Sequence, residues 1–335
     1  MALPDDYELR APNRDELQAV ANVLVADELD DGGQVVLGAD FIQGAWSRPD
    51  FDLKTDAWVA VDGAGTIVGY AQVRRDEPML VESWGVVDPA DRGRGIGSSL
   101  FGRVEQRAIR LLDGQADSRF RHSINASDRA AASMLREQGL RPIRHFWHMQ
   151  IDLAGPVEAG PAPDGMEITA IDPPGDLPVV HAILVDAFVD DQGHHPESFE
   201  AWVEEEATGP RFDPALWLLA KEDGQAVGAL TASLSGDRGW VDYLAVLGSH
   251  RGRGVGAALL RRSFATLARP GVERVLVNVD AENPTGATDL YERVGMRIVK
   301  RWDLWERAPA NAATAVTSAS ISGSTRAQRS VAADG

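Results

Sequence analysis

Apolar and polar residues follow one another in two similar stretches that predict paired β-strands. Residues 57–73 and 216–234 each hold two apolar runs around a short polar turn, DGAG in the first and EDGQ in the second. Apolar runs around turn-forming residues are typical of β-hairpins. Another apolar run follows each hairpin, at 80–87 and at 239–247. The pattern therefore predicts three consecutive strands in each half of the chain.

Helical spacing replaces this strand pattern after the last of these runs. In residues 254–268, Val255, Leu259 and Leu267 are apolar at the spacing of one helix face, and the RPG that follows predicts the helix end. The β-rich run RVLVNVD at 274–280 comes next. Strands that alternate with helices in this way predict a mixed α/β fold.

The two halves repeat one another as whole domains. Arg92 and Arg251 lie 159 positions apart, as do Trp58 and Trp217. A constant offset over this length predicts two copies of one fold.

Domain boundaries follow from the repeat and from composition. Proline and glycine are frequent between the copies, as in a linker, and the C-terminal end is small, polar and without periodicity, which predicts disorder. The expected parts are a first domain at 5–153, a linker at 154–164, a second domain at 165–307 and a disordered tail at 308–335.

Composition narrows the possible classes of protein. Hydrophobic residues make up 44% and charged residues 25%, as in soluble globular proteins. Cysteine is absent, which excludes disulfides, thiolate metal sites and cysteine nucleophiles. A formal charge of −18 argues against nucleic-acid binding. The N-terminus has no signal-peptide pattern and no apolar run could span a bilayer, so we expect a cytoplasmic protein that binds no membrane.

Two arginine-framed glycine clusters, RGRGIG at 92–97 and RGRGVG at 251–256, each join a predicted strand to a predicted helix. Glycines let the backbone approach a ligand closely, and the first amides of a helix attract anions. The arginines add local positive charge. Two copies at the same junction favour a phosphate-binding role over a purely structural turn.

Other phosphate-binding folds fit less well. Gly252, Gly254 and Ala257 match the dinucleotide-binding fingerprint, with Asp280 ending the next strand. That fingerprint should follow the first strand of a domain, however, and here it comes after several. The first copy has Ser98 in place of the last small residue, and no lysine follows the glycines as a P-loop requires.

Both clusters resemble the GNAT N-acetyltransferases, whose signature is [RQ]-x-x-G-x-[GA] between a strand and a helix. The matching residues are Arg251, Gly254 and Gly256 in one copy and Arg92, Gly95 and Gly97 in the other. A second GNAT pattern, N-x-x-[AG]-x-x-x-L-Y-x-x-x-G-[FM], is matched by Asn283, Gly286, Leu290, Tyr291, Gly295 and Met296. The resemblance covers both repeats, as in tandem GNATs of the mycothiol synthase type.

This resemblance implies two tandem GNAT domains, each a bent mixed sheet flanked by helices, with acetyl-CoA between two strands that separate. The amides of the cluster would hold the CoA pyrophosphate, and no metal is implied. The expected cofactor-binding residues are Leu244, Ala245, Val246, Arg251, Gly252, Arg253, Gly254, Val255, Gly256, Ala257 and Asn283 in the second copy, and Val86, Val87, Arg92, Gly93, Arg94, Gly95, Ile96, Gly97 and Ser98 in the first.

Acetyl transfer to an amine needs a base for the ammonium and an acid for the departing thiolate. The resemblance places Tyr291 beside the CoA sulfur, and a phenol can donate that proton. The glutamate that the family often uses as base falls on Trp240, which accepts no proton. Asp242 lies two residues on, on the same face of the strand. It could serve as base, as substrate anchor or only as a polar bystander.

The first copy lacks this acid. Aligning Gly139 with Gly295 places Leu135 opposite Tyr291 and Ser127 opposite Asn283. Leucine donates no proton, so we expect catalysis only in the second domain.

Acidic residues gather in the region that borders the acceptor site in GNATs. Between 181 and 207 the chain has no lysine or arginine. Its eight acids are Asp186, Asp190, Asp191, Glu197, Glu200, Glu204, Glu205 and Glu206. An acidic rim would attract an amine, although such runs are often only the solvated face of a helix. The pair His194 and His195 predicts no metal site, because adjacent side chains point apart.

These observations predict an acetyl-CoA-dependent N-acetyltransferase that acts on a small-molecule amine, or on a protein amine, in its second domain. A mycothiol-synthase-like activity on an aminoacyl glycoside is one alternative, although the strand lacks the glutamate expected for it. A CoA-binding or sensing module without catalysis is another.

Overall fold

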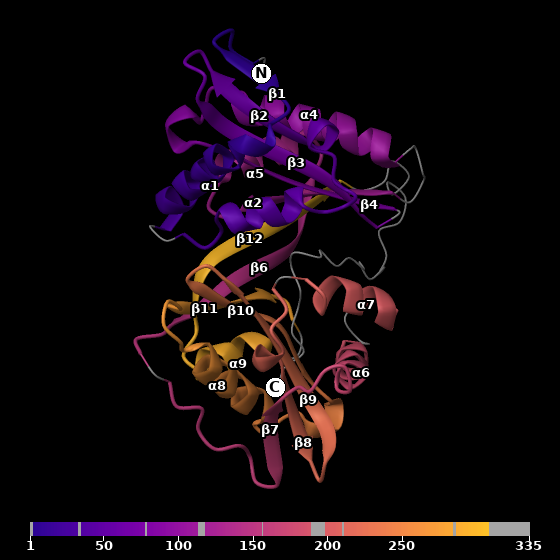
Figure 1. The fold of residues 1–335 in the computed structure, drawn as a ribbon. Helices are drawn as coiled ribbons and strands as arrows, with labels where there is room; N and C mark the ends of the chain where they lie inside the picture. Colours follow the sequence, from indigo (N-terminus) through magenta and orange to yellow (C-terminus); the bar gives the residue numbers. More distant parts are fainter. Residues whose placement is uncertain are drawn as a thin grey trace. The chain divides into compact units, whose positions relative to one another are not determined.

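The structure is a computed structural model in which the chain forms two compact units (Figure 1). The described residues are 3–32, 35–77, 79–112, 118–155, 157–188, 198–209, 211–283 and 286–307. The first unit extends to His145 and resumes at Lys300, whereas the second comprises Phe146–Val299. The expected tail at 308–335 lies outside the described residues.

The first unit is a sheet of order β1-β2-β3-β4-β5-β12 in which only β4 and β5 are parallel. Helices α1 and α4 both pack against β3 and β4. The strands are β1 (Tyr7–Arg10), β2 (Ala57–Asp62), β3 (Ile67–Glu77), β4 (Leu80–Val87), β5 (Arg119–Asn125) and β12 (Arg297–Arg307). The helices are η1 (Arg14–Glu16), α1 (Leu17–Gly32), α2 (Ala39–Trp46), α3 (Leu53–Asp56), η2 (Pro89–Asp91), α4 (Ile96–Leu112) and α5 (Arg129–Glu137).

The second unit repeats this plan in the order β6-β11-β10-β9-β8-β7, with β10 and β11 parallel. Its strands are β6 (Arg141–Asp152), β7 (Met166–Ala170), β8 (Leu218–Glu222), β9 (Gln225–Ser235), β10 (Arg238–Val246) and β11 (Arg274–Asp280). Its helices are α6 (Leu177–Ala187), α7 (Phe199–Glu206), η3 (Pro214–Leu216), η4 (Gly248–His250), α8 (Val255–Leu267) and α9 (Ala287–Arg293).

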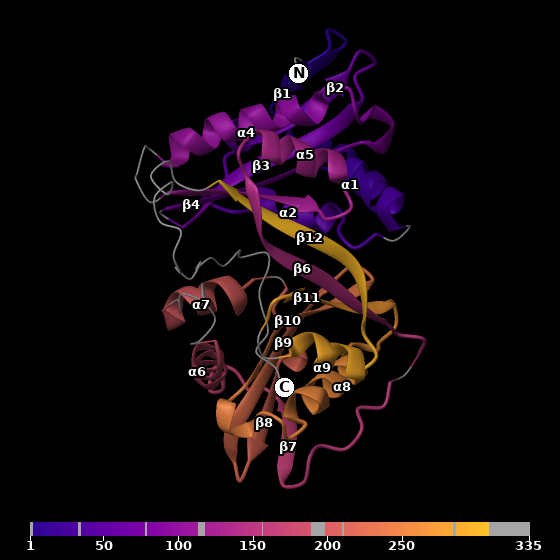
Figure 2. The ribbon, with the colours of Figure 1, turned by 180° about the vertical axis from the view of Figure 1, so that it is seen from behind.

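Each repeat contributes its last strand to the other unit, which the sequence did not predict. Strand β6 of the first repeat pairs with β11 from Phe146 to Asp152, and β12 of the second repeat pairs with β5 from Trp302 to Arg307. The two crossing strands are visible in Figure 2. The compact units therefore differ from the repeats 5–153 and 165–307 in their last strand.

A row of alternating charges holds β12 in the first unit. Arg74, Glu82, Arg121 and Glu306 are register neighbours on β3, β4, β5 and β12. Glu82 lies 3.3 Å from the guanidinium of Arg74, and Arg121 donates to Glu306 at 2.9 Å. Burial and the neighbouring Asp76 raise the pKa of Glu82, whereas the two arginines oppose this rise. Because an unpaired buried charge is costly, the row favours a strand that carries an acid at position 306.

In the second unit, β9 and β10 have α8 on one face and α6 on the other (Figures 1 and 2). A Cβ on Gly239 would lie 2.9 Å from the side chain of Leu267, so this residue faces α8. On the other face, the ring of Phe188, at the end of α6, lies 6.3 Å from that of Tyr243. Gly239 and Tyr243 are both odd-numbered but face opposite layers, because the register of β10 shifts by one residue between Val241 and Tyr243. Among the described residues, no helix is both long and apolar enough to cross a membrane.

Candidate active site in the second unit

The parallel strands at the centre of the second unit separate part of the way along their length. Strands β10 and β11 pair only from Arg238 to Val241 on β10, although β10 continues to Val246 and β11 to Asp280. In the first unit, β4 likewise leaves β5 after Trp84. Leu244, Ala245 and Val246, three of the predicted cofactor-binding residues, lie in the part of β10 that pairs with β9 but not with β11. The split offers main-chain groups to an extended ligand.

The glycine cluster turns the chain from β10 into α8. Gly252 and Gly254 have φ of 71° and 80°, in the left-handed region that glycine adopts most readily. The first bond inside the helix runs from the N–H of Ala258 to the carbonyl of Gly254 at 3.1 Å. The first N–H groups of an α-helix lie beyond the reach of its own carbonyls, and in α8 these groups belong to the turn that begins at Val255. This helix start suits the pyrophosphate of CoA.

The two arginines of this cluster fasten the loop. Arg251 donates to the carbonyls of Val246 and Ala187 at 3.2 and 3.1 Å. Arg253 forms an ion pair with Glu222 at 2.5 Å and lowers the pKa of that carboxyl. Their side chains thus position the loop.

The first unit has the same loop with different partners. Gly93 and Gly95 also have positive φ, and predicted residues 96–98 form the first turn of α4. Arg92 pairs here with two carboxylates of α1, Asp27 at 2.6 Å and Asp30 at 2.7 Å. Because these acids add negative charge beside the loop, an anion is less favoured here than in the second unit.

The remaining predicted residues of the first unit lie around this loop. Val86 and Val87 form the end of β4, beyond its pairing with β5. Arg94 donates to the hydroxyl of Tyr7 at 2.7 Å. Its guanidinium also lies 3.2 Å from the carboxylate of Asp91.

Tyr291 of α9 is fully buried, and its hydroxyl has no hydrogen-bond partner among the described residues. Burial raises its pKa well above 10, so the phenol keeps its proton at neutral pH. Buried hydroxyls are normally paired, and an unpaired one indicates a missing partner. A thiol sulfur in the split between β10 and β11 would supply that partner. At the other predicted position, Asn283, the N–H donates to the carbonyl of Asp280 at 3.2 Å.

Asp242 forms a β-bulge in β10 at the level where the strands separate. The pairing with β9 shifts between Val241 and Tyr243, which leaves Asp242 as the extra residue. Its carboxylate accepts from the hydroxyl of Ser233 at 3.2 Å, and the exposed Arg211 lies 3.7 Å away. Ser233 is the register neighbour of Trp240, so Asp242 and Trp240 share the face that the sequence predicted.

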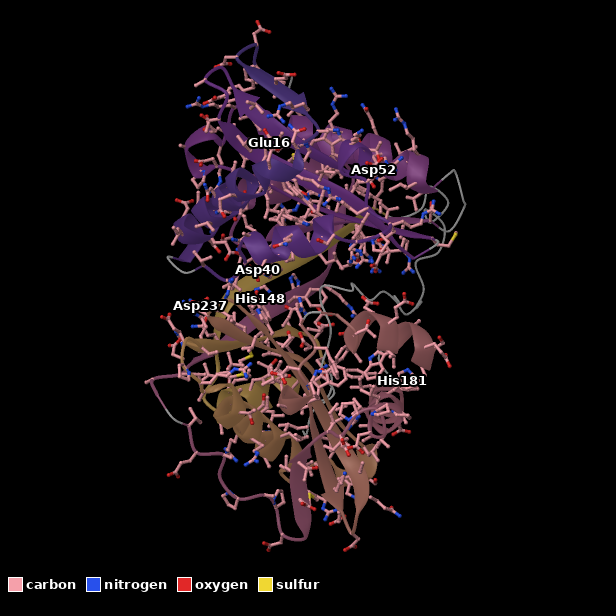
Figure 3. All side chains as sticks on the ribbon, viewed as in Figure 1. Glu16, Asp40, Asp52, His148, His181 and Asp237 are labelled. Carbon is pink, nitrogen blue, oxygen red and sulfur yellow. The ribbon has the colours of Figure 1, made fainter. Side chains whose placement is uncertain are left out.

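This face of the second unit, opposite α8, carries several polar side chains. Trp240 packs edge-on against His148 of β6, with ring centroids 5.7 Å apart (His148 is labelled in Figure 3). His148 is the register neighbour of Asn278 on β11. The sequence analysis missed both His148 and Asn278. The asparagine within the apolar run VLVNV was the available signal, whereas the position of His148 depends on the exchanged strand.

The bulge changes which residues of the two repeats are equivalent on β10 and β4. On β9 and β3, Ser233 and Arg74 are equivalent by the repeat offset, and they pair with Trp240 and Glu82. The first unit has no bulge at this level, so Glu82 occupies the place that Trp240 has in the second unit. Glu82 is buried in the row of alternating charges. In the first unit, Leu135 occupies the position that corresponds to Tyr291, so no tyrosine is present there.

The acidic region near the acceptor side is described in part. Asp186 lies on α6, and α7 carries the other described acids, which are Glu200, Glu204, Glu205 and Glu206. Asp190, Asp191, His194, His195 and Glu197 lie outside the described residues. His181 of α6 packs against the rings of Phe199 and Trp202 of α7. Within the described part of the chain, no cluster of three or more potential metal ligands occurs.

Comparisons with known proteins agree with this geometry. The acetyltransferase (GNAT) family matches residues 34–140 and 177–296. The mycothiol acetyltransferase of Cellulomonas flavigena is 31% identical over 255 residues, which are 71% of each chain. That of Streptomyces avermitilis is 32% identical over 237 residues, 69% of this chain and 73% of the relative.

Solved structures show the same architecture. A GCN5-related N-acetyltransferase from Sphaerobacter thermophilus has a TM-score of 0.79 at 30% identity and covers 92% of this chain and 97% of its own. A tandem GNAT protein from the clavulanic acid biosynthesis pathway has a TM-score of 0.63 at 19% identity, with coverage of 91% and 99%. The expected fold and the expected family are thereby confirmed, and the chain belongs to the GNAT acetyltransferases of the tandem two-domain type.

Proposed function

We propose that this chain transfers the acetyl group of acetyl-CoA to the amino group of an aminoacyl glycoside of the Cys-GlcN-Ins type. The relatives named mycothiol acetyltransferase support this acceptor, since they align over more than two thirds of both chains. They favour the glycoside over the simple amine that the sequence alone predicted. The expected partner is then a small molecule. Among the described residues, no helix is long and apolar enough to span a membrane.

The observation that carries the catalytic part of the proposal is the unpaired, buried hydroxyl of Tyr291. Acetyl-CoA supplies an activated acetyl thioester, which the loop 251–257 and the split between β10 and β11 would hold. Tyr291 donates its phenolic proton to the departing sulfur. Asp242 accepts the proton of the acceptor ammonium, directly or through a water, from the opposite face of β10. In the first unit Leu135 replaces the tyrosine, so catalysis takes place in the second.

Turnover of acetyl-CoA with a panel of acceptors tests this function. We expect free thiol to be released with Cys-GlcN-Ins at a kcat/KM at least roughly tenfold above that for simple amines or lysine peptides. A site shaped for the glycoside gains binding energy from its hydroxyl and amide groups. Equal or higher kcat/KM for simple amines would refute the acceptor, and acetyl-CoA binding without any turnover would favour the sensing module.

The role of Asp242 can be tested with Asp242→Asn. If the carboxylate is the base, kcat should fall roughly a hundredfold while the KM for the acceptor changes little, because the amide accepts no proton. An increase in the acceptor KM at unchanged kcat would instead identify an anchor, and wild-type kinetics would identify a bystander. Asp237→Asn is a matched control, since Asp237 is an exposed acid between β9 and β10 (labelled in Figure 3) and should leave both constants unchanged.

A further inference from the structure

Asn278 of β11 is a buried amide without a described partner. The residue is 9% exposed, and neither Oδ1 nor Nδ2 forms a hydrogen bond with any described residue. Buried amides in folded proteins are nearly always paired, because leaving a donor and an acceptor unpaired costs free energy of folding. An apolar residue at this position would avoid that cost. The two unpaired groups therefore indicate a partner that binds from outside the chain.

The strand register places this amide at the split. Val241 and Val277 form the last pair between β10 and β11, and Asn278 is the next residue on β11. At the same level β10 carries the bulge residue Asp242. The amide and the carboxylate therefore lie on the two sides of the opening between the strands.

Alternation along β11 determines the face on which the amide lies. Gly239 of β10, which faces α8, is the register neighbour of Val275 on β11, so Val277 and Val279 also face α8. Asn278 between them therefore faces the other side of the sheet, with its register neighbour His148. Tyr291, in contrast, lies on α9, which packs against α8. The amide is consequently on the side of Trp240 and Asp242, where the acceptor would approach.

We propose that the carboxamide of Asn278 is a specificity-determining residue that hydrogen-bonds the acceptor in the second unit. A carboxamide offers one donor group and one acceptor group, which match an amide or neighbouring hydroxyls of the bound molecule. An aminoacyl glycoside carries both kinds of group, so this inference rests on the proposed function. His148 and Trp240 border the same position and would limit the acceptor to molecules that fit beside them.

Replacing Asn278 by leucine, which has nearly the same size, separates this role from a structural one. We expect the thermal midpoint of the ligand-free protein to stay the same or rise, because two unpaired polar groups are removed. The kcat/KM for the acceptor should fall roughly tenfold to a hundredfold, as when a site loses hydrogen bonds to its substrate. The KM for acetyl-CoA should change less than about twofold.

Ser263→Ala is the matched control. The hydroxyl of Ser263 in α8 is also buried and unpaired among the described residues, but it lies on a helix remote from the acceptor face. This variant should keep wild-type kinetics with an equal or higher midpoint. Asn278→Asp keeps a hydrogen-bond-accepting oxygen but loses the N–H donor. This variant should bind the acetyl acceptor less tightly and still fold.

Three outcomes would overturn the proposal. A lower midpoint together with lower activity in Asn278→Leu would show a structural role, and unchanged kinetics would show none. A raised KM for acetyl-CoA alone would assign the amide to the cofactor. The variants are compared on the amine that the wild-type protein acetylates fastest, so a preference for another amine refutes the glycoside without affecting this test. If the wild-type protein acetylates no amine, both proposals fail.

Discussion

Tyr291→Phe should lower turnover by roughly a hundredfold or more while acetyl-CoA still binds with its normal affinity. The substitution removes one hydroxyl and keeps the ring, so the shape of the site changes little. Without the phenolic proton the departing sulfur must leave as a thiolate, which raises the barrier of the chemical step. Steady-state kinetics and an acetyl-CoA titration on the same preparation would measure both quantities.

Tyr70→Phe in the first unit is the control for this variant. Tyr70 is also fully buried, but its hydroxyl accepts from Trp46 and donates to Gln72, both at 2.8 Å. We therefore expect Tyr70→Phe to lose about 1 kcal/mol of stability with normal turnover. Tyr291→Phe should instead keep its stability and lose turnover. Near-normal turnover in Tyr291→Phe would mean that another group protonates the sulfur.

Gly254→Val should weaken CoA binding by roughly a hundredfold or abolish it. The left-handed φ of 80° is strained for a β-branched residue. Apart from Pro163 at 4.0 Å, a new Cβ would meet nothing, so the side chain would occupy the space in front of the helix start where the phosphates should bind. Calorimetric titration with CoA would measure the loss.

Gly224→Val provides the comparison for backbone strain. Gly224 lies in the turn between β8 and β9, has a φ of 79° and also has nothing within 4 Å of a new Cβ. It should lose similar stability but keep its affinity for CoA. Equal affinity in both variants would disprove the assignment of the glycine cluster to phosphate.

Local patterns in the sequence were sufficient for most of the fold. The hairpins around DGAG and EDGQ, the helix from Val255 and the repeat offset all depend on neighbouring residues or on internal similarity, and the structure contains them. The paired motifs around Arg251 and Tyr291 were specific enough to identify the family, which the comparisons confirm. The roles of the individual site residues stay predictions.

Long-range partners and irregular backbone could not be predicted in this way. No strand at 141–152 or 297–307 was predicted from the sequence, and local patterns there contain no information on which sheet edge each strand joins. Glu306 meets Arg121 only after the chain has folded. Similarly, a period of two cannot show that Asp242 is a bulge residue, because the extra residue exists only relative to β9. The sequence also cannot show that the amide of Asn278 lacks a hydrogen-bond partner, because this depends on which residues surround it in the folded protein.

The exchange of β6 and β12 has a consequence for how such a protein can evolve after gene duplication. A duplicated domain that differs from its copy at a candidate site residue, as the first repeat does with Leu135 in place of Tyr291, would ordinarily be free to disappear by deletion. Here the deletion would remove the strand that covers the edge of β11 and would leave β12 without a sheet to join. The architecture thus requires the first copy, and its persistence is no argument that it binds a ligand of its own.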